Sequence, residues 1–187
     1  EPGSSFWHTY NSIWTPSPGG HQICATTSNP NGLTDINPSD DNLCLYGGVF
    51  DSVKVTLTDP YCNDFEGGHP QFIPMNSYNY SLATSDWQVG TPGKSIINSA
   101  HSGTHSWITK LTGDYLSRDS SGLFTPVFAV DTDGCYELSF WQNFKTELFQ
   151  DGGTVDYSID GGHSWRLLGF AYEPGWFNSL YVTGLIG

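Results

Sequence analysis

The sequence has few basic residues. Only six of its 187 residues are lysine or arginine, against 19 aspartates and glutamates, so the formal net charge is −13. Such a chain would be repelled by a phosphate backbone or by an anionic membrane surface, and we therefore expect no nucleic-acid partner. The same acidity is compatible with two roles, solubility and the binding of Ca²⁺, whose preferred ligands are carboxylates.

Long apolar runs and helical periodicity are also missing. No run reaches the length of a membrane span and no signal peptide is present, so no membrane insertion is expected. The abrupt opening Glu-Pro-Gly predicts that an export signal lies upstream. No window carries apolar residues at i, i+3, i+4 and i+7 without an interrupting Gly or Pro. Only 13% of the residues are charged, whereas 22 Gly and 11 Pro imply many turns, so an all-β fold is expected.

The sequence contains few patterns that indicate catalysis. There is no Gly-x-Ser-x-Gly elbow for a serine nucleophile. His101 and His105 are four residues apart, but Gly103 lies between them and no Glu follows His101, unlike the helical zinc motif. A glycosidase needs a pair of carboxylates, and because the chain has many acidic residues such a pair stays an open alternative. We expect a protein that is not an enzyme.

The four cysteines lack the close spacing of a zinc or redox site. An even number of cysteines in a chain rich in Gly, Asn and Trp indicates disulfides and an oxidising compartment, and hence an extracellular or cell-surface protein. Three connectivities are possible. We prefer Cys24–Cys44 with Cys62–Cys135.

A tight hairpin is predicted over residues 154–169. Thr154 to Ile159 alternates polar and apolar side chains, which indicates a half-buried strand, and Asp160-Gly161-Gly162-His163 supplies turn formers. Trp165 is expected to enter the core beneath the turn. The spacing Ser158-x-Asp160-x-Gly162-x-Ser164-Trp165 resembles the Asp-box hairpin of many extracellular β-proteins. A sialidase would imply several such boxes and an arginine cluster, so we expect Asp160 to be structural.

Residues 1–59 are predicted to be the C-terminal part of an immunoglobulin-like module. Strands are expected at 6–10, 21–26, 43–45 and 49–57, and the polar loop 29–41 is interpreted as a turn rather than a metal site. This part resembles the immunoglobulin-like modules of bacterial surface proteins through Pro18-Gly19, Pro30-Asn31-Gly32, Asp35, Asn37 and Asp40-Asp41. About four of the seven strands of such a module are visible. Asp59-Pro60 is the expected hinge, unless Pro60 closes a strand inside one larger domain.

Residues 60–187 are predicted to form a second all-β domain. Strands are expected at 72–73, 87–89, 106–111, 122–130 and 136–144, with 122–130 as a central strand because both its faces are apolar. The order of several short motifs resembles the MAM-like jelly-roll domains of large secreted adhesins and peptidases of Bacteroidetes-type bacteria. These motifs are Cys62-x-Asp64-Phe65-Glu66, Trp87-x-x-Gly90-x-Pro92, Asn98-x-Ala100-x-Ser102-Gly103-x-x-x-Trp107, Leu111-Thr112-Gly113-x-Tyr115, Thr125-Pro126-Val127-Phe128 and Leu138-x-Phe140-Trp141. The resemblance implies an antiparallel jelly-roll sandwich that lacks its last strands here.

The same resemblance implies a calcium site. It points to Glu66 with Asp64, and to the loop that carries Asn98 and Ser102, whose carbonyl oxygens could join the carboxylates. The alternative is that Asp64 and Glu66 are ordinary acids at a strand edge.

An aromatic cluster follows the hairpin. Tyr172, Trp176 and Phe177 are candidates for stacking on a sugar ring, or for packing against the missing strands.

These features together predict an extracellular adhesion or accessory binding module of a larger bacterial protein, stabilised by Ca²⁺. The expected partners are other domains or chains of the assembly, a glycan, or a host or cell-surface protein. Two alternatives stay open, a carbohydrate-binding module of a secreted hydrolase and a non-catalytic domain of a secreted peptidase.

Overall fold

All the regular structure that we describe is β-structure. The computed structural model describes residues 7, 9–29, 32–67, 71–76, 85–130, 134–147, 149–169 and 182. These residues contain no α-helix, which confirms the expected all-β class, and so none that could cross a membrane. The strands are β1 (Gly19–Thr26), β2 (Asn42–Val49), β3 (Ser52–Val55), β4 (Ile73–Asn76), β5 (Trp87–Gly90), β6 (Ser106–Thr109), β7 (Ser121–Phe124), β8 (Val127–Val130), β9 (Asp156–Tyr157) and β10 (Arg166–Leu167).

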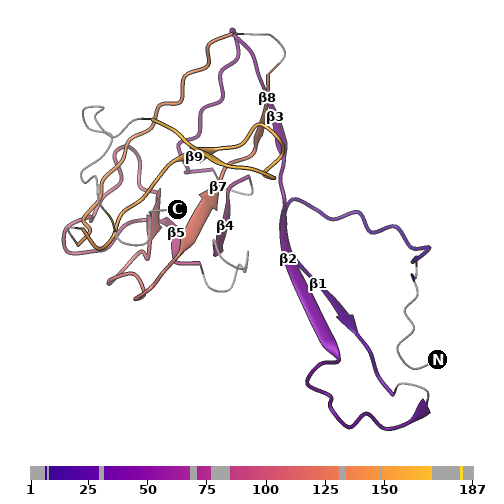
Figure 1. The fold of residues 1–187 in the computed structure, drawn as a ribbon. Coiled ribbons are helices and arrows are strands. Elements are labelled where there is room, and N and C mark those ends of the chain that lie inside the picture. Colours follow the sequence, from indigo (N-terminus) through magenta and orange to yellow (C-terminus); the bar gives the residue numbers. More distant parts are fainter. Residues whose placement is uncertain are drawn as a thin grey trace.

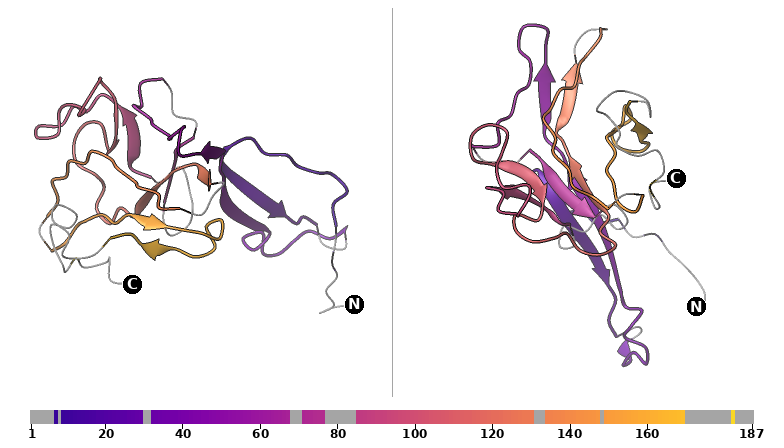
Figure 2. Two further views of the ribbon diagram at one scale, coloured as in Figure 1. Left: turned by 90° about the horizontal axis from the view of Figure 1, so that it is seen from above. Right: turned by 90° about the vertical axis from the view of Figure 1, so that its left-hand side faces the viewer.

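Strands β1 and β2 form a long two-stranded ribbon that we call the arm. They pair antiparallel through eight residue pairs, from Gly19 opposite Val49 to Thr26 opposite Asn42. The arm projects away from the lobe formed by the described residues from 50 onward, which we call the body (Figures 1 and 2). The Cys24–Cys44 disulfide joins directly opposite residues, so the first expected disulfide is confirmed.

The body is built from four further strand pairs. β4 pairs with β7, β5 with β6 and β9 with β10, all antiparallel, whereas β3 and β8 run parallel. Since the described strands pair two by two, the jelly roll and the immunoglobulin-like sandwich both stay predictions. The boundary between residues 59 and 60 is also a prediction, although β3, on its N-terminal side, pairs with β8 far beyond it.

Several expected strands have different bounds in the structure. The expected central strand 122–130 is interrupted after Phe124 by Thr125-Pro126, because proline has no N–H for a ladder. Its second half, β8, is exposed along its whole length rather than central. Residues 134–147 form no ladder with any other described residue, so the expected strand 136–144 stays a prediction. The described part of 6–10 likewise forms no strand.

The described part of the buried core centres on β4 and β6. Among the described residues, the buried apolar side chains are Ile73 and Met75 of β4, Ile108 of β6, and Val182. Asp86, directly before β5, is the one buried charged residue in this part of the chain.

Candidate functional site

Glu66 is held by a loop that lies almost forty residues further along the chain. Its Oε1 accepts the backbone N–H groups of Thr104 and His105, each at 2.7 Å. Its Oε2 accepts the Thr104 hydroxyl at 2.7 Å and faces His105 Nδ1 at 2.8 Å. A carboxylate offers about four lone-pair positions, so all of them are used in this Glu66 clamp.

These donors stabilise the charged form of Glu66. Its pKa falls from 4.5 to about 2, chiefly through the side-chain and backbone hydrogen bonds of His105 and then those of Thr104. Gly103 lets the carboxylate approach this closely. It has φ +63°, and a Cβ at this position would clash with Glu66 Oε1. The loop is therefore shaped around the carboxylate.

The predicted calcium ligands are only partly brought together. Glu66 does reach the predicted loop, but at residues 103–105 rather than at Asn98 or Ser102, which are exposed. Asp64 uses Oδ1 to accept the Glu66 N–H at 3.1 Å, an ordinary turn contact. Because the Glu66 acceptors are already occupied, this arrangement does not fit a directly bound ion. Calcium at Asp64, Glu66, Asn98 and Ser102 stays a prediction.

The loop of the Glu66 clamp is also fixed from its other side. The His101 ring stacks on Trp141 at 3.8 Å between centroids and 9° between planes. Trp141 is nevertheless 77% exposed. The predicted sequence motifs contained both residues, but nothing in their spacing indicated that they would meet.

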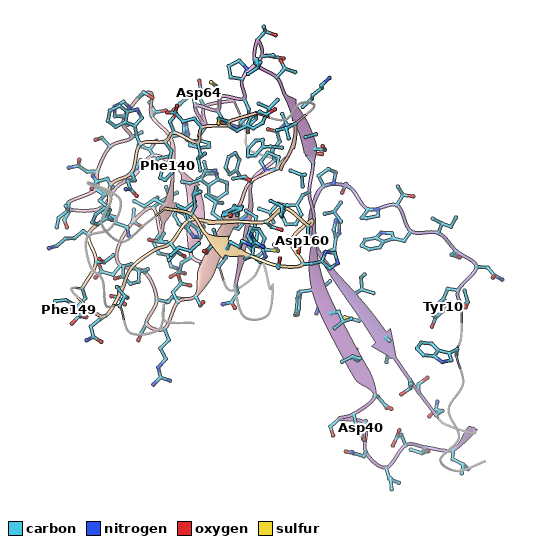
Figure 3. The ribbon with its side chains drawn as sticks, turned by 45° about the horizontal axis from the view of Figure 1, so that its top comes forward. Tyr10, Asp40, Asp64, Phe140, Phe149 and Asp160 are labelled. Atoms are coloured by element: carbon cyan, nitrogen blue, oxygen red, sulfur yellow. A yellow bond between two sulfur atoms is a disulfide. The ribbon has the colours of Figure 1, made fainter. Side chains whose placement is uncertain are left out.

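The Asp-box hairpin closes through its own side chains. Asp160 Oδ1 accepts the Ser158 hydroxyl at 2.7 Å and the Ser164 N–H at 2.9 Å, and its Oδ2 accepts the Ser164 hydroxyl at 2.6 Å. Ser158 Oγ also accepts the Gly162 N–H at 2.8 Å. The Ser164 hydrogen bonds, with that of Ser158, hold the pKa of Asp160 well below its usual range. The geometry fits a structural role for Asp160, which lies near the base of the arm (Figure 3).

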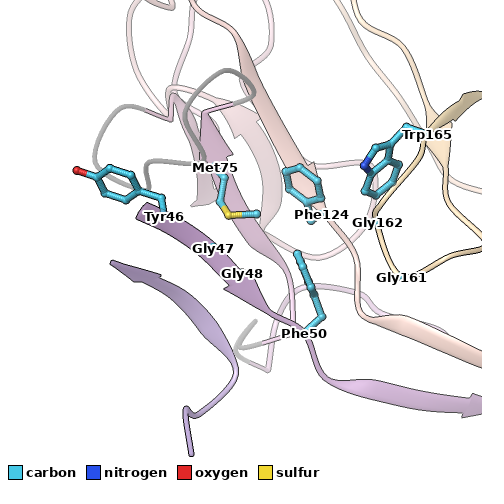
Figure 4. A pocket seen from close by; sticks show the side chains of 9 residues that line it. All are labelled: Tyr46, Gly47, Gly48, Phe50, Met75, Phe124, Gly161, Gly162 and Trp165. Carbon is cyan, nitrogen blue, oxygen red and sulfur yellow. The ribbon is translucent and has the colours of Figure 1, made fainter. Parts of the chain in front are cut away.

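Trp165 lies beneath this turn but is not a core residue. It meets Phe124 edge-on at 5.6 Å and remains 46% exposed. The two rings line one side of a mostly apolar pocket of about 210 Å³ between the arm and the hairpin. Figure 4 shows Met75, Phe124 and Phe50 converging on it. The full lining is Tyr46, Gly47, Gly48, Phe50, Met75, Phe124, Gly161, Gly162 and Trp165.

Comparison with known proteins gives one distant similarity. Bacillopeptidase F of Bacillus subtilis (strain 168) is 28% identical over 124 residues, which cover 65% of this chain and 8% of that protein. No family model matches the sequence, and no solved structure matches it. About two thirds of the chain is thus similar to a small part of a much longer peptidase, and no family is assigned.

The remaining sequence predictions have mixed outcomes. Cys62 and Cys135 are exposed free thiols, so the second expected disulfide is not formed in the structure. Cys62 directly follows Tyr61, whose ring packs on Phe128 in the middle of β8, whereas Cys135 lies beyond the end of that strand. The aromatic candidates Tyr172, Trp176 and Phe177 lie outside the described residues.

Three acidic residues gather at the tip of the arm. The carboxylates of Asp35, Asp40 and Asp41 lie within 4.8 Å of one another. They also make the turn contacts that we expected of this loop, since Asp35 Oδ1 accepts the Asn37 N–H at 2.8 Å and Asp40 Oδ2 accepts the Asn37 amide at 2.9 Å. The turn interpretation is therefore sufficient for this loop.

A buried ion pair was not found by sequence reasoning. Asp86 is 1% exposed, and its Oδ1 lies 2.9 Å from Lys110 Nζ. Nearby, burial raises the pKa of Asp119, whose Oδ1 accepts the Ser121 hydroxyl. The pair joins the residue before β5 to the residue after β6, so it links these two paired strands at one end.

Proposed function

We propose that this chain is an extracellular, non-catalytic accessory module of a larger protein, of the kind carried by adhesins and by peptidases. The observation that carries the proposal is the state of its carboxylates. Glu66 and Asp160 have strongly lowered pKa values because their own loops occupy their oxygens. A general base needs a free lone pair directed at its substrate, and neither group offers one.

Two further observations support the proposal. The Cys24–Cys44 disulfide is typical of an oxidising, extracellular environment. The similarity to a small part of Bacillopeptidase F is what a non-catalytic domain shared with a peptidase would give. Adhesion or accessory binding, to a cell-surface protein or a glycan, is the activity that we propose for such a module.

The test combines an activity assay with a binding assay. The purified chain is incubated with casein, a short fluorogenic peptide and chromogenic glycosides, and is separately titrated onto whole cells and polysaccharides. We expect no turnover and saturable binding to at least one surface. Turnover that is lost in Asp160→Asn or Glu66→Gln would overturn the proposal, and so would the absence of binding to every surface tried.

Calcium is a secondary proposal that competes with the Glu66 clamp. An ion bound by Glu66 would have to replace the donors of Thr104 and His105, so the two states are exclusive. A thermal melt in calcium and in EDTA separates them. A calcium site predicts a melting temperature that falls in EDTA for the natural chain and not for Glu66→Gln, whereas the clamp predicts curves that do not depend on EDTA.

A further inference from the structure

The arm has two chemically different faces. Residues directly opposite each other on paired strands lie on the same face, so Gln22, Cys24 and Thr26 share one face with Tyr46, Cys44 and Asn42. This face is internally satisfied, by Gln22 Nε2 donating to Tyr46 Oη at 2.8 Å, by the disulfide, and by a Thr26–Asn42 contact. It is the polar face of the arm.

The opposite face is apolar and open. It carries Ile23 opposite Leu45 and Ala25 opposite Leu43. Ile23 is 57% exposed, and Leu43 and Leu45 are each 66% exposed. The body does not cover the side chains of this face, because all three of these large apolar residues are more than half exposed. We call Ile23, Ala25, Leu43 and Leu45 the apolar arm face.

Another exposed aromatic residue extends the apolar arm face. Trp14 borders the apolar arm face, since its ring meets His21 edge-on at 5.1 Å, and His21 alternates onto the same side as Ile23. Trp14 is 55% and the adjacent Ile13 is 93% exposed. Trp14 thus extends the exposed apolar surface of Ile23, Leu43 and Leu45, and a contiguous exposed apolar patch of a few hundred Å² often marks an interaction site.

Charge and rigidity also favour a second copy of this chain. Neither strand carries an Asp, Glu, Lys or Arg, so no charged side chain of the strands loses its hydration when the apolar arm face is covered. The acidic residues of the arm, Asp35, Asp40 and Asp41, lie at its tip, so two arms crossing in opposite directions keep these charges apart. The disulfide preforms the ribbon, which lowers the entropy cost of binding.

We propose that two copies of the chain associate through their arms, the apolar arm face of one packing on that of the other about a twofold axis. The arrangement is a small sandwich of two ribbons with both disulfides on its outside. Sheets in sandwiches pack in this way, whereas an isolated two-stranded ribbon is marginally stable in water. Acidic repulsion between copies opposes the contact, so added salt should strengthen it.

The competing geometry is edge-to-edge pairing of two β1 strands. The directions of the backbone N–H groups in the arm show which residue would distinguish it from face-to-face packing. Thr27 N donates to Asp41 O at 2.8 Å, so odd-numbered residues of β1 direct their N–H groups toward β2. The 4.0 Å between the Cα atoms of Cys24 and Cys44 fits the close, non-hydrogen-bonded pair of an antiparallel ladder. The Gln22 N–H therefore points outward, where edge pairing would need it.

The experiment is sedimentation velocity on the full chain at roughly 1 to 200 µM, in about 20 mM and about 500 mM NaCl. We expect a reversible monomer–dimer equilibrium that is tighter at the higher salt. Ile23→Lys should weaken the dimer at least about 100-fold, because it places a charge in an apolar contact. Gln22→Lys adds the same charge one residue away on the polar face, and should change the dissociation constant less than about threefold.

Two further variants complete the test. Leu45→Lys repeats the charge on the other strand, and thiol titration verifies that the disulfide of each variant has formed. Gln22→Pro removes the outward N–H and should leave the dimer intact. The proposal is overturned by a monomer at every concentration at high salt, by open-ended oligomers, by equal effects of Ile23→Lys and Gln22→Lys, or by a dimer that only Gln22→Pro dissociates.

Discussion

Replacing Lys110 by methionine should destabilise the body, because it leaves a buried carboxylate without its counter-ion. Asp86 lies directly before β5 and Lys110 directly after β6, and Lys110 N also donates to Asp86 O at 2.9 Å. The Asp86 side chain keeps one hydrogen bond after the change, from Leu116 N to Oδ2 at 2.5 Å. Its other oxygen loses the ammonium group in a site that is only 1% exposed.

The size of the effect follows from this geometry. Breaking a buried ion pair by removing one partner costs about 3 to 5 kcal/mol. The lower end applies here because the Lys110 side chain is 29% exposed, so water already reaches that side of the pair. A loss of about 3 kcal/mol corresponds to a fall of roughly 6 to 12 °C in melting temperature for a chain of this length. Thermal unfolding followed by tryptophan fluorescence measures it.

A double variant decides whether the buried charge is the cause. Asp86→Asn removes the charge and keeps the hydrogen bond to Leu116, so Asp86→Asn with Lys110→Met should be more stable than Lys110→Met alone. Lys145→Met, at an exposed lysine, should leave the melting temperature within about 2 °C. The reasoning is refuted if the double variant is no more stable than Lys110→Met, or if Lys145→Met is equally destabilising.

Three other changes test separate parts of the structure. Glu66→Gln should lower the melting temperature at neutral pH. The difference from the natural chain should shrink as pH falls from 4.5 toward 2, because the lowered pKa contributes stability only while Glu66 is charged. A difference that does not depend on pH would contradict the Glu66 clamp. Asp160→Ala should speed hydrogen exchange at Leu168 N, which bonds Val155 O at 2.7 Å across the hairpin, and unchanged exchange there would contradict the role of Asp160. Cys24→Ser with Cys44→Ser should cost the arm about 3 kcal/mol and remove exchange protection from β1 and β2 but not from β4 and β7; loss everywhere would contradict an independent arm.

Some long-range features were predictable because their chemistry leaves few choices. Four cysteines allow only three connectivities, and the pair at Cys24 and Cys44 flanks one polar loop, so its disulfide could be anticipated. The Glu66 partner loop was also located to within a few residues, although the resemblance named Asn98 and Ser102 and the structure uses Thr104 and His105. The spacing of these residues along the chain gave no sign that backbone N–H groups would donate hydrogen bonds to the Glu66 carboxylate.

One expectation failed because apolar side chains on both faces of a segment were taken to indicate a central strand. Residues 122–130 are apolar on both faces, yet Thr125-Pro126 interrupts the strand and its second half, β8, is exposed. The pairing of β3 with β8 and the ion pair of Asp86 with Lys110 left no signal in any short window.

The sequence by itself determined the local chemistry of this protein. Its all-β class follows from turn formers and missing helical periodicity, and the Asp-box hairpin from serines and an aspartate that bond within six residues of one another. Only the tertiary structure decided which strands meet, which face of the arm stays open, and that Trp165 lies half-exposed beside a pocket. The physical reason is that a turn is closed by residues that are neighbours in the sequence. Packing instead brings together distant segments, and their distance in space does not follow from the number of residues between them.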